Sequence, residues 1–249
     1  MRKIIIRLTT FLLLSLGISV QASAAPLVKQ SPYITIGGFA NYISNLTPTT
    51  DILVTIPDPN NPDTTISTPI TEITNNLGGG ATLSFGYKYQ SIRGEAQVLY
   101  SYARYKRIKV LNDQDIDSLA QVRTRGDASI FAGLFNILLD FDFLGNERNE
   151  FIFVPYIGGG AGYANIQNTP ELNYSIIDPE TTIPNFKSSL SESSVAYQGI
   201  IGARIYMDSV SSVNLDYRIL SIGSLSNFKS LNMHSINLTF SFMLDKKNR

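Results

Sequence analysis

Strict alternation of apolar and polar residues is the feature that most constrains the fold of this chain. In the segment 235–242, four apolar residues alternate with Ser, Asn, Thr and Ser. Because successive side chains of a β-strand point to opposite faces, this pattern predicts a strand with one apolar and one polar face. The same alternation recurs in 81–89, 92–102 and 213–219. The chain is therefore expected to be all-β.

Eight strands are expected when the less regular segments are included, and the connections between them alternate in length. The expected strands are 33–43, 80–89, 92–106, 124–142, 150–164, 195–206, 212–221 and 232–243. Short connections fall near 90–91, 145–149 and 208–211, whereas long ones fall at 44–79, 107–123, 165–194 and 222–231. Tight turns on one side and long loops on the other are typical of outer-membrane barrels, with the loops extracellular.

A soluble β-sandwich is the competing fold, because its strands also alternate. Three features favour a membrane barrel. The segments reach the ~10 residues that a tilted membrane strand needs, formal charges occupy the polar faces, and tyrosines gather at strand ends, where a girdle would lie. The girdle candidates are Tyr42, Tyr87, Tyr89, Tyr100, Tyr102, Tyr197 and Tyr217. We therefore predict an eight-stranded antiparallel up-and-down transmembrane β-barrel formed by residues 25–249.

Residues 1–24 have the organisation of a secretory signal peptide. A basic start is followed by the apolar stretch 8–20 and by the small-residue site Ala22-Ser23-Ala24. The apolar stretch is shorter than a membrane anchor, so cleavage and export to the bacterial outer membrane are expected. Cleavage leaves a net charge of −3.

The composition excludes several classes of function. The chain has 20 basic and 20 acidic residues and no concentrated basic cluster, which argues against a nucleic-acid partner. It has no cysteine, so disulfides, thiolate nucleophiles and zinc–thiolate sites are absent. The glycine runs 78–80 and 158–160 lack the helix context of phosphate-binding loops, and no calcium-loop spacing occurs. No cofactor or metal is expected.

Charged residues on the polar faces should project into the barrel. The expected interior charges are Arg93, Glu95, Asp127, Arg204, Asp216 and Arg218. The interior of an eight-stranded barrel is just wide enough to be filled by side chains, so these groups must pair with one another. They are interpreted as a structural plug, with a narrow ion path as the alternative.

Catalysis has little support in the sequence. His234 is the only histidine, and a histidine beside a nucleophilic serine could deacylate lipid A. His234 and Ser235 are adjacent, however, so on a strand they point to opposite faces. His234 is interpreted as an interfacial structural residue, and the protein as a non-enzyme.

Several segments carry a resemblance to a known family. Residues 154–163, 196–204 and 214–218, with the pattern Leu134-Phe135-Asn136-Ile137-Leu138-Leu139-Asp140-Phe141, resemble the opacity-protein and surface-antigen superfamily of small outer-membrane barrels, including rickettsial-type antigens. The resemblance implies an eight-stranded, surface-exposed antigen, and some members are adhesins or bind host proteins. Such chains commonly end on an aromatic residue that the assembly machinery recognises. Here Phe240 and Phe242 precede the tail 243–249, so either these two residues serve as an internal insertion signal or the tail is a short periplasmic extension.

The long loops are expected to carry the function. The loop 44–79 is rich in proline and has a net charge of −4, and 165–194 has −3. Such segments are expected to be mobile and to bury no core, and their acidity favours a host partner with a basic patch. The predicted function is a monomeric, non-enzymatic surface antigen, adhesin-like and embedded in outer-membrane lipid. A small porin-like channel and a structural membrane-integrity protein are the alternatives.

Overall fold

The computed structural model describes twelve strands and no helix within residues 30–49, 53–58, 61–110, 114–115, 122–141, 153–174, 186–187, 189–208, 210–223, 225 and 229–244. Eight of the strands form the barrel wall: β1 (Gln30–Ile43), β4 (Gly78–Tyr89), β5 (Ile92–Val110), β7 (Val122–Asp140), β8 (Phe153–Tyr174), β10 (Leu190–Tyr206), β11 (Ser211–Ile222) and β12 (Leu231–Met243). The others are β2 (Leu53–Asp58), β3 (Asn61–Asn75), β6 (Gln114–Asp115) and β9 (Phe186–Lys187). Within these residues, none forms a helix long and apolar enough to cross a membrane.

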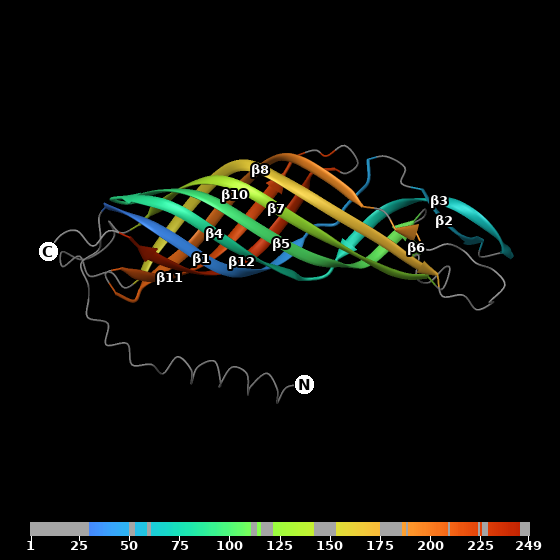
Figure 1. Ribbon diagram of the computed structural model, residues 1–249, viewed down its shortest axis with the longest axis horizontal. Helices are drawn as coiled ribbons and strands as arrows, with labels where there is room; N and C mark the ends of the chain where they lie inside the picture. The colour runs from blue at the N-terminus through green and yellow to red at the C-terminus, as the bar shows by residue number, and fades with distance from the viewer. Residues whose placement is uncertain are drawn as a thin grey trace, which may run out of the picture.

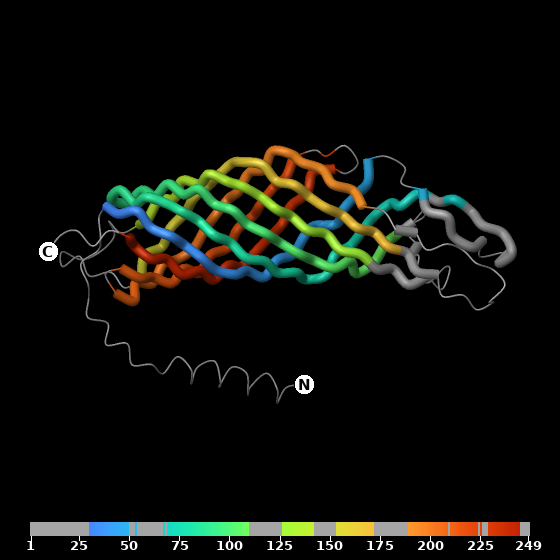
Figure 2. The backbone as a smooth tube through the Cα atoms, in the orientation of Figure 1, coloured from blue at the N-terminus to red at the C-terminus, as the bar shows by residue number. Residues whose placement is uncertain are grey.

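The eight wall strands form a closed antiparallel ring. Each pairs with its neighbours in chain order, and β1 pairs with β12, so that Tyr33 lies opposite Met243. The pairing of β5 with β7 completes the ring. Figures 1 and 2 show the resulting barrel, with its strands inclined to the long axis. The predicted eight-stranded antiparallel barrel is confirmed.

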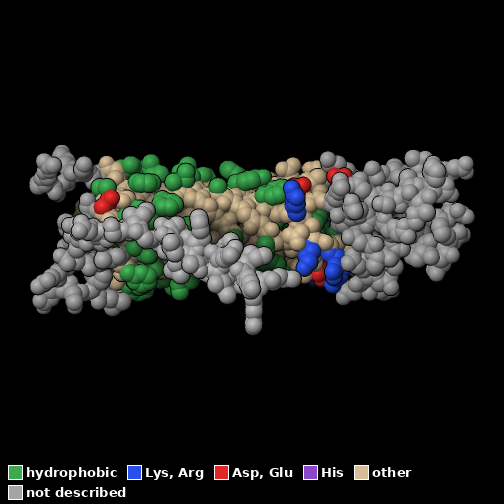
Figure 3. Space-filling model, turned by 90° about the horizontal axis from the view of Figure 1, so that it is seen from below, with side chains coloured by type: hydrophobic (Ala, Val, Ile, Leu, Met, Phe, Trp, Pro, Cys, Tyr) green, Lys and Arg blue, Asp and Glu red, His purple; other side chains and the backbone are tan. Residues whose placement is uncertain are grey.

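Alternation along each strand produces an inverted distribution of polarity. In β12 the polar residues Ser235, Asn237 and Thr239 are buried, whereas Ile236 and Leu238 are exposed. Apolar side chains accordingly lie along the outside of the barrel in Figure 3. An exterior of this kind requires an apolar solvent, because water would make its exposure unfavourable.

The two ends of the barrel differ. One end, called here the turn end, carries the short β4–β5 connection at 90–91 and the β10–β11 connection at 207–210. The other, called the loop end, carries the β2–β3 hairpin, which projects beyond the barrel in Figure 1. The expected turn 145–149 and the signal segment 1–24 lie outside the described residues.

Several strands extend further toward the loop end than the alternation predicted. β8 continues to Tyr174 instead of ending at 164, β5 continues to Val110, and β10 begins at Leu190. These extensions form because β7 and β8 continue to pair up to Val122 and Tyr174. Backbone hydrogen bonds between strands do not require alternating side chains, so the strands continue where the apolar–polar alternation is lost.

The first long connection contains regular structure, and the expectation that it buries no core is wrong. β2 and β3 form a hairpin, and β3 pairs with the outer part of β5, with Ile73 opposite Ile108. Leu46 bridges to Ile73, and Leu46, Ile70, Ile73 and Ile108 are buried in one cluster. The proline and acid content of this segment suggested that it had no core, but its β-branched residues Ile70 and Ile73 are buried.

Candidate functional site

The interior of the barrel near the turn end holds a buried ion-pair network centred on Asp140. Arg93 places Nη2 2.8 Å from Oδ1 of Asp140 and donates from Nη1 to Glu95 at 3.1 Å. Lys88 Nζ lies 3.2 Å from Oδ2 of the same aspartate. Asp140 therefore holds two cations from neighbouring strands in a space from which water is excluded.

Tyrosines complete this network. Tyr33 donates its hydroxyl hydrogen to Glu95 at 2.7 Å, and Lys88 donates to the hydroxyl of Tyr206 at 3.2 Å. The guanidinium of Arg93 lies 4.7 Å from the ring centre of Tyr156. Such contacts stabilise charged groups that burial would otherwise destabilise.

A second ion pair stands beside the first. Arg218 donates from Nε to Oδ1 of Asp216 at 2.5 Å and from Nη2 to Oδ2 at 3.0 Å. Tyr156 donates to the same carboxylate at 2.7 Å. The two-pronged geometry is the strongest form of an arginine–carboxylate pair.

Arg204 is also enclosed, but no acid of the described residues lies within ion-pair distance of it. Its Nε donates to Oδ1 of Asn214 at 2.7 Å, and its guanidinium lies 5.6 Å from the ring centre of Tyr33. Asn214 in turn donates to Thr239 and Ser241. This arginine is held by neutral polar groups and aromatic rings instead of a carboxylate.

A neutral polar layer separates the charged region from the loop-end half. Gln97 donates to Thr82 at 2.6 Å, Asn136 donates to Gln97 at 2.9 Å, and Gln198 donates to both Gln97 and Asn136. The three amides and the Thr82 hydroxyl come from four strands, β4, β5, β7 and β10. They fill the centre of the barrel with hydrogen-bonded side chains.

The loop-end half of the interior is mainly apolar, although Asn41, Ser101 and Asn168 are also buried there. Its buried residues form one cluster that includes Phe39, Ile43, Leu99, Ile130, Leu134, Ile166, Leu220, Ile222, Leu231 and Met233. The sequence did not predict this separation of charged from apolar residues along the interior, because alternation predicts only which side chains face inward. An ion crossing the barrel would have to pass this apolar packing as well as the charged network.

Five of the six expected interior charges lie in the interior, and Asp127 does not. Arg93, Glu95, Arg204, Asp216 and Arg218 are all buried there. Asp127 is only half-buried, lies near the loop end opposite Arg104, and follows the outward parity of β7, whose inward residues begin at Ala128. Its assignment to the interior is corrected, because one residue of offset moves a side chain to the other face.

Sequence analysis missed two members of the network, Lys88 and Asp140. Lys88 lies between the outward residues Tyr87 and Tyr89, so its parity already indicated the interior. Asp140 follows the inward positions Asn136 and Leu138 at the end of β7. Both could have been found by extending the alternation to the strand ends.

The expected girdle residues all face outward. Tyr87 and Tyr89 are exposed at the turn end, and Tyr42, Tyr100, Tyr102, Tyr197 and Tyr217 are exposed nearer the loop end. Phe240 and Phe242, the expected insertion signal, also face outward, near the turn end of β12. Aromatic residues in this arrangement fit the two boundaries of a membrane.

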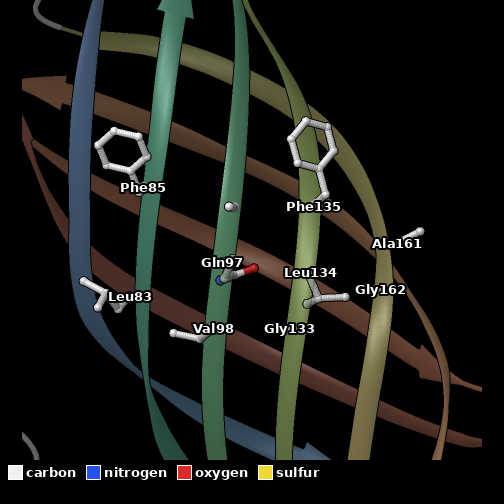
Figure 4. Close-up of a pocket in the computed structure, with 10 residues that line it drawn as sticks. Leu83, Phe85, Gln97, Val98, Gly133, Leu134, Phe135, Ala161 and Gly162 are labelled. Carbon is white, nitrogen blue, oxygen red and sulfur yellow. The ribbon is translucent and has the colours of Figure 1, made fainter.

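Between the two groups of girdle tyrosines, the outer wall has a shallow apolar groove of about 550 Å³. Figure 4 shows Phe85 and Phe135 standing on either side of it, with Val98 and Leu83 further along. Ala96 lies between the two rings on β5, and its small side chain leaves the wall low there. An acyl chain fits such a surface without any polar contact.

His234 has a tyrosine as its partner. The Tyr217 hydroxyl lies 2.7 Å from Nδ1 of His234 on the outer face, whereas Ser235 is buried in the interior. The two adjacent residues therefore point to opposite faces and share no proton. Within the described residues, no group of histidine and acidic side chains is placed to hold a metal ion.

Solved structures of small outer-membrane proteins resemble this barrel. Neisserial surface protein A has a TM-score of 0.48 at 12% identity, over 86% of this chain and 99% of that chain. Ail, the attachment invasion locus protein of Yersinia pestis, solved with the heparin analogue sucrose octasulfate, has 0.43 at 12%, over 86% and 100%. OprG from Pseudomonas aeruginosa has 0.42 at 12%, over 88% and 98%.

No curated protein matches the sequence. A family model does match, and it covers residues 10–243, nearly the whole chain. The match agrees with the closed ring, the apolar exterior and the tyrosine belts described above. The chain belongs to the family described as outer membrane protein beta-barrel domain.

Proposed function

We propose that this outer-membrane barrel is a non-enzymatic surface protein that binds a host partner through its loop end. The observation that carries the proposal is the extension of β5, β7, β8 and β10, with the β2–β3 hairpin, beyond the loop-side tyrosines. Strands that rise past the membrane boundary form a rigid platform outside it. A signal peptide cleaved after residue 24 would deliver the chain to the periplasm, and barrels of this type have their long loops outside the cell.

The charge of the platform refines the kind of partner. The segment 44–79 holds four acids and no base, but Glu72 lies 3.8 Å from Lys109 and accepts hydrogen bonds from Asn45 and Thr74. Glu72 therefore interacts with other residues of the protein and is not a candidate contact for a partner. Asp51, Asp58 and Asp63 are the remaining acids of that segment, and we propose that they favour a partner with a basic patch.

The filled interior favours this function over a porin-like channel. The apolar cluster and the charged network occupy successive levels of the interior, so the barrel wall serves as a scaffold for its loops. The closed ring leaves no free strand edge in the membrane, and a monomer is the expected state.

The test removes the hairpin tip without disturbing the barrel. Leu53 lies directly opposite Pro69, so residues 54–68 can be replaced by Asn-Gly, a two-residue turn that joins paired strands. Adherence to cultured host cells is measured for a non-adherent bacterial strain that produces either protein. We expect the full-length protein to confer adherence and the shortened protein to lose it.

Two controls separate shape, charge and folding. The variant D58N/D63N keeps the hairpin and removes two acids, and it should weaken adherence if a basic partner is bound. Heat-dependent gel migration verifies that each barrel is folded. Equal adherence of the full-length and shortened proteins, or none with the full-length protein, would contradict the proposal.

Orientation is tested separately, since the chain has no cysteine. Single substitutions Ser67→Cys in β3 and Met207→Cys beside the β10–β11 turn introduce one thiol each. On intact cells, a membrane-impermeant maleimide should label the first and spare the second. The reverse pattern would mean that the loop end faces the periplasm.

A further inference from the structure

An exposed leucine, Leu77, lies near the loop end of the barrel, in the short connection between β3 and β4. Leu77 is 80% exposed, and it lies between two hollows in the outer surface. One hollow is lined by Asn76, Leu77, Gly78, Gly79, Tyr102, Ala103 and Arg104. The other is lined by Tyr42, Asn75, Asn76, Leu77 and Lys106. Each hollow thus combines the same apolar side chain with one tyrosine and one cation.

The two cations are available to a ligand. Arg104 and Lys106 are exposed on β5, and no acid of the described residues lies within ion-pair distance of either. Lys109, further along the same strand, differs from them because it lies 3.8 Å from Glu72. Asp127 is opposite Arg104 in register, yet the two side chains do not reach ion-pair distance. Among the residues that the structure describes, Arg104 and Lys106 are thus two outward cations of β5 with no carboxylate partner.

The position of these residues along β5 sets the depth of the site. The outward positions of β5 run through Val98, Tyr100 and Tyr102 to Arg104 and Lys106. Alternate residues of a strand are about 7 Å apart, so the cations begin one step beyond the last tyrosine. Lys and Arg side chains gather at this end of the apolar surface in Figure 3. Lipid headgroups occupy this level, and acyl chains occupy the level below it.

The shape of the first hollow favours an apolar chain beneath an anionic group. Gly79 takes an outward position of β4, and without a side chain there the wall beside Tyr102 stays low. Leu77 and Tyr102 supply apolar surface on either side of this gap. A cation above apolar surface suits a ligand that is itself divided into a charged head and a hydrocarbon tail.

We propose that this surface binds a phosphorylated lipid of the outer leaflet. The lipid phosphate lies between Arg104 and Lys106, where charge-assisted hydrogen bonds form. One acyl chain descends along Leu77 and Tyr102. This site is separate from the proposed host-binding platform, and it would fix the depth and rotation of the barrel in the membrane.

The test is a titration of the purified barrel in neutral maltoside micelles, followed by native mass spectrometry. Diphosphoryl lipid A is the probe, and dephosphorylated lipid A and inorganic phosphate are the comparison ligands. We expect diphosphoryl lipid A to bind at least about tenfold more tightly than the dephosphorylated lipid, and R104Q/K106Q to lose about tenfold in affinity. Leu77→Ser should weaken lipid binding through the lost apolar contact.

Matched variants keep the outcome interpretable. Lys229→Gln removes an exposed cation elsewhere at the loop end and should leave affinity unchanged, and R104K/K106R keeps both charges and should retain binding. Heat-dependent gel migration confirms that each variant is folded. Equal binding by R104Q/K106Q, equal binding of the dephosphorylated lipid, or inorganic phosphate competing at the same concentration as the lipid would each overturn the proposal.

Discussion

Arg93 on β5 and Asp140 on β7 meet inside the barrel, with Nη2 of the arginine 2.8 Å from Oδ1 of the aspartate. Both side chains are excluded from solvent. Arg93 lies at the beginning of its strand and Asp140 at the end of its own, so the antiparallel pairing of β5 with β7 brings them together. Lys88 reaches the same carboxylate from β4, and the aspartate thereby joins three consecutive strands.

Asp140→Asn should lower the free energy of unfolding by about 3–5 kcal/mol, because it leaves Arg93 and Lys88 buried beside a neutral amide. Urea titration in lipid vesicles, followed by circular dichroism, measures the change. Asp127→Asn is the matched control, because it makes the same chemical change outside the network, and it should cost no more than about 0.5 kcal/mol. Similar costs for the two variants would argue against the network as a source of stability.

The barrel should not conduct ions, since its interior is filled by charged, polar and apolar side chains in turn. In planar bilayers we expect no steady single-channel currents from the wild-type protein. Glu95→Gln and Arg218→Gln should lower stability by several kcal/mol without altering permeation. A wild-type current that changes with either substitution would favour the channel function.

Asp208 should make the β10–β11 turn sensitive to acid. Its Oδ2 accepts a hydrogen bond from the Ser211 hydroxyl, and Oδ1 accepts from the backbone N–H groups of Val210 and Ser211. These bonds, chiefly the one from the Ser211 hydroxyl, hold the pKa of the Asp208 carboxyl below its usual range. The carboxylate therefore stabilises the fold above its unfolded-state pKa of about 3.9, and this contribution disappears as the pH falls through the lower folded-state pKa.

Asp208→Ala should accordingly cost roughly 0.5–1 kcal/mol at pH 7, as expected for exposed hydrogen bonds. The difference from wild type should vanish once the pH lies below the folded-state pKa. Unfolding titrations across this pH range give the comparison. A difference that persists unchanged in acid would mean that the carboxylate charge is not responsible.

Gly160 should resist substitution where another strand glycine accepts it. A Cβ on Gly160 would lie 2.6 Å from the carbonyl oxygen of Phe135 and 2.9 Å from Cγ of Asn136, whereas one on Gly133 meets nothing within 4 Å. Gly160→Ala should lower the free energy of unfolding by about 1–3 kcal/mol through overpacking. Gly133→Ala should be neutral or slightly stabilising. The yield of refolded barrel and urea titration measure both, and equal tolerance would contradict close packing at Gly160.

The alternation along β12 was sufficient to predict its two faces, and the same rule placed Arg93, Glu95 and Arg218 inside. It was sufficient because parity along a strand depends only on the local backbone. The rule failed for Asp127. This residue lies near the loop end of β7, where apolar and polar residues no longer alternate clearly, so its face could not be assigned from the sequence. The tyrosine belts followed from the same local information.

Tertiary structure alone decided which strand each interior residue meets. The sequence placed Arg93 and Asp216 in the interior but did not give their contacts with Asp140 and Tyr156, because those contacts depend on the register between strands. The pairing of β3 with β5 and the burial of Ile73 also arose there, against the polar composition of the segment. The sequence by itself determined an eight-stranded barrel with an apolar exterior. The division of its interior into charged and apolar halves, and the two cations beside Leu77, were decided only when closure fixed the register of neighbouring strands.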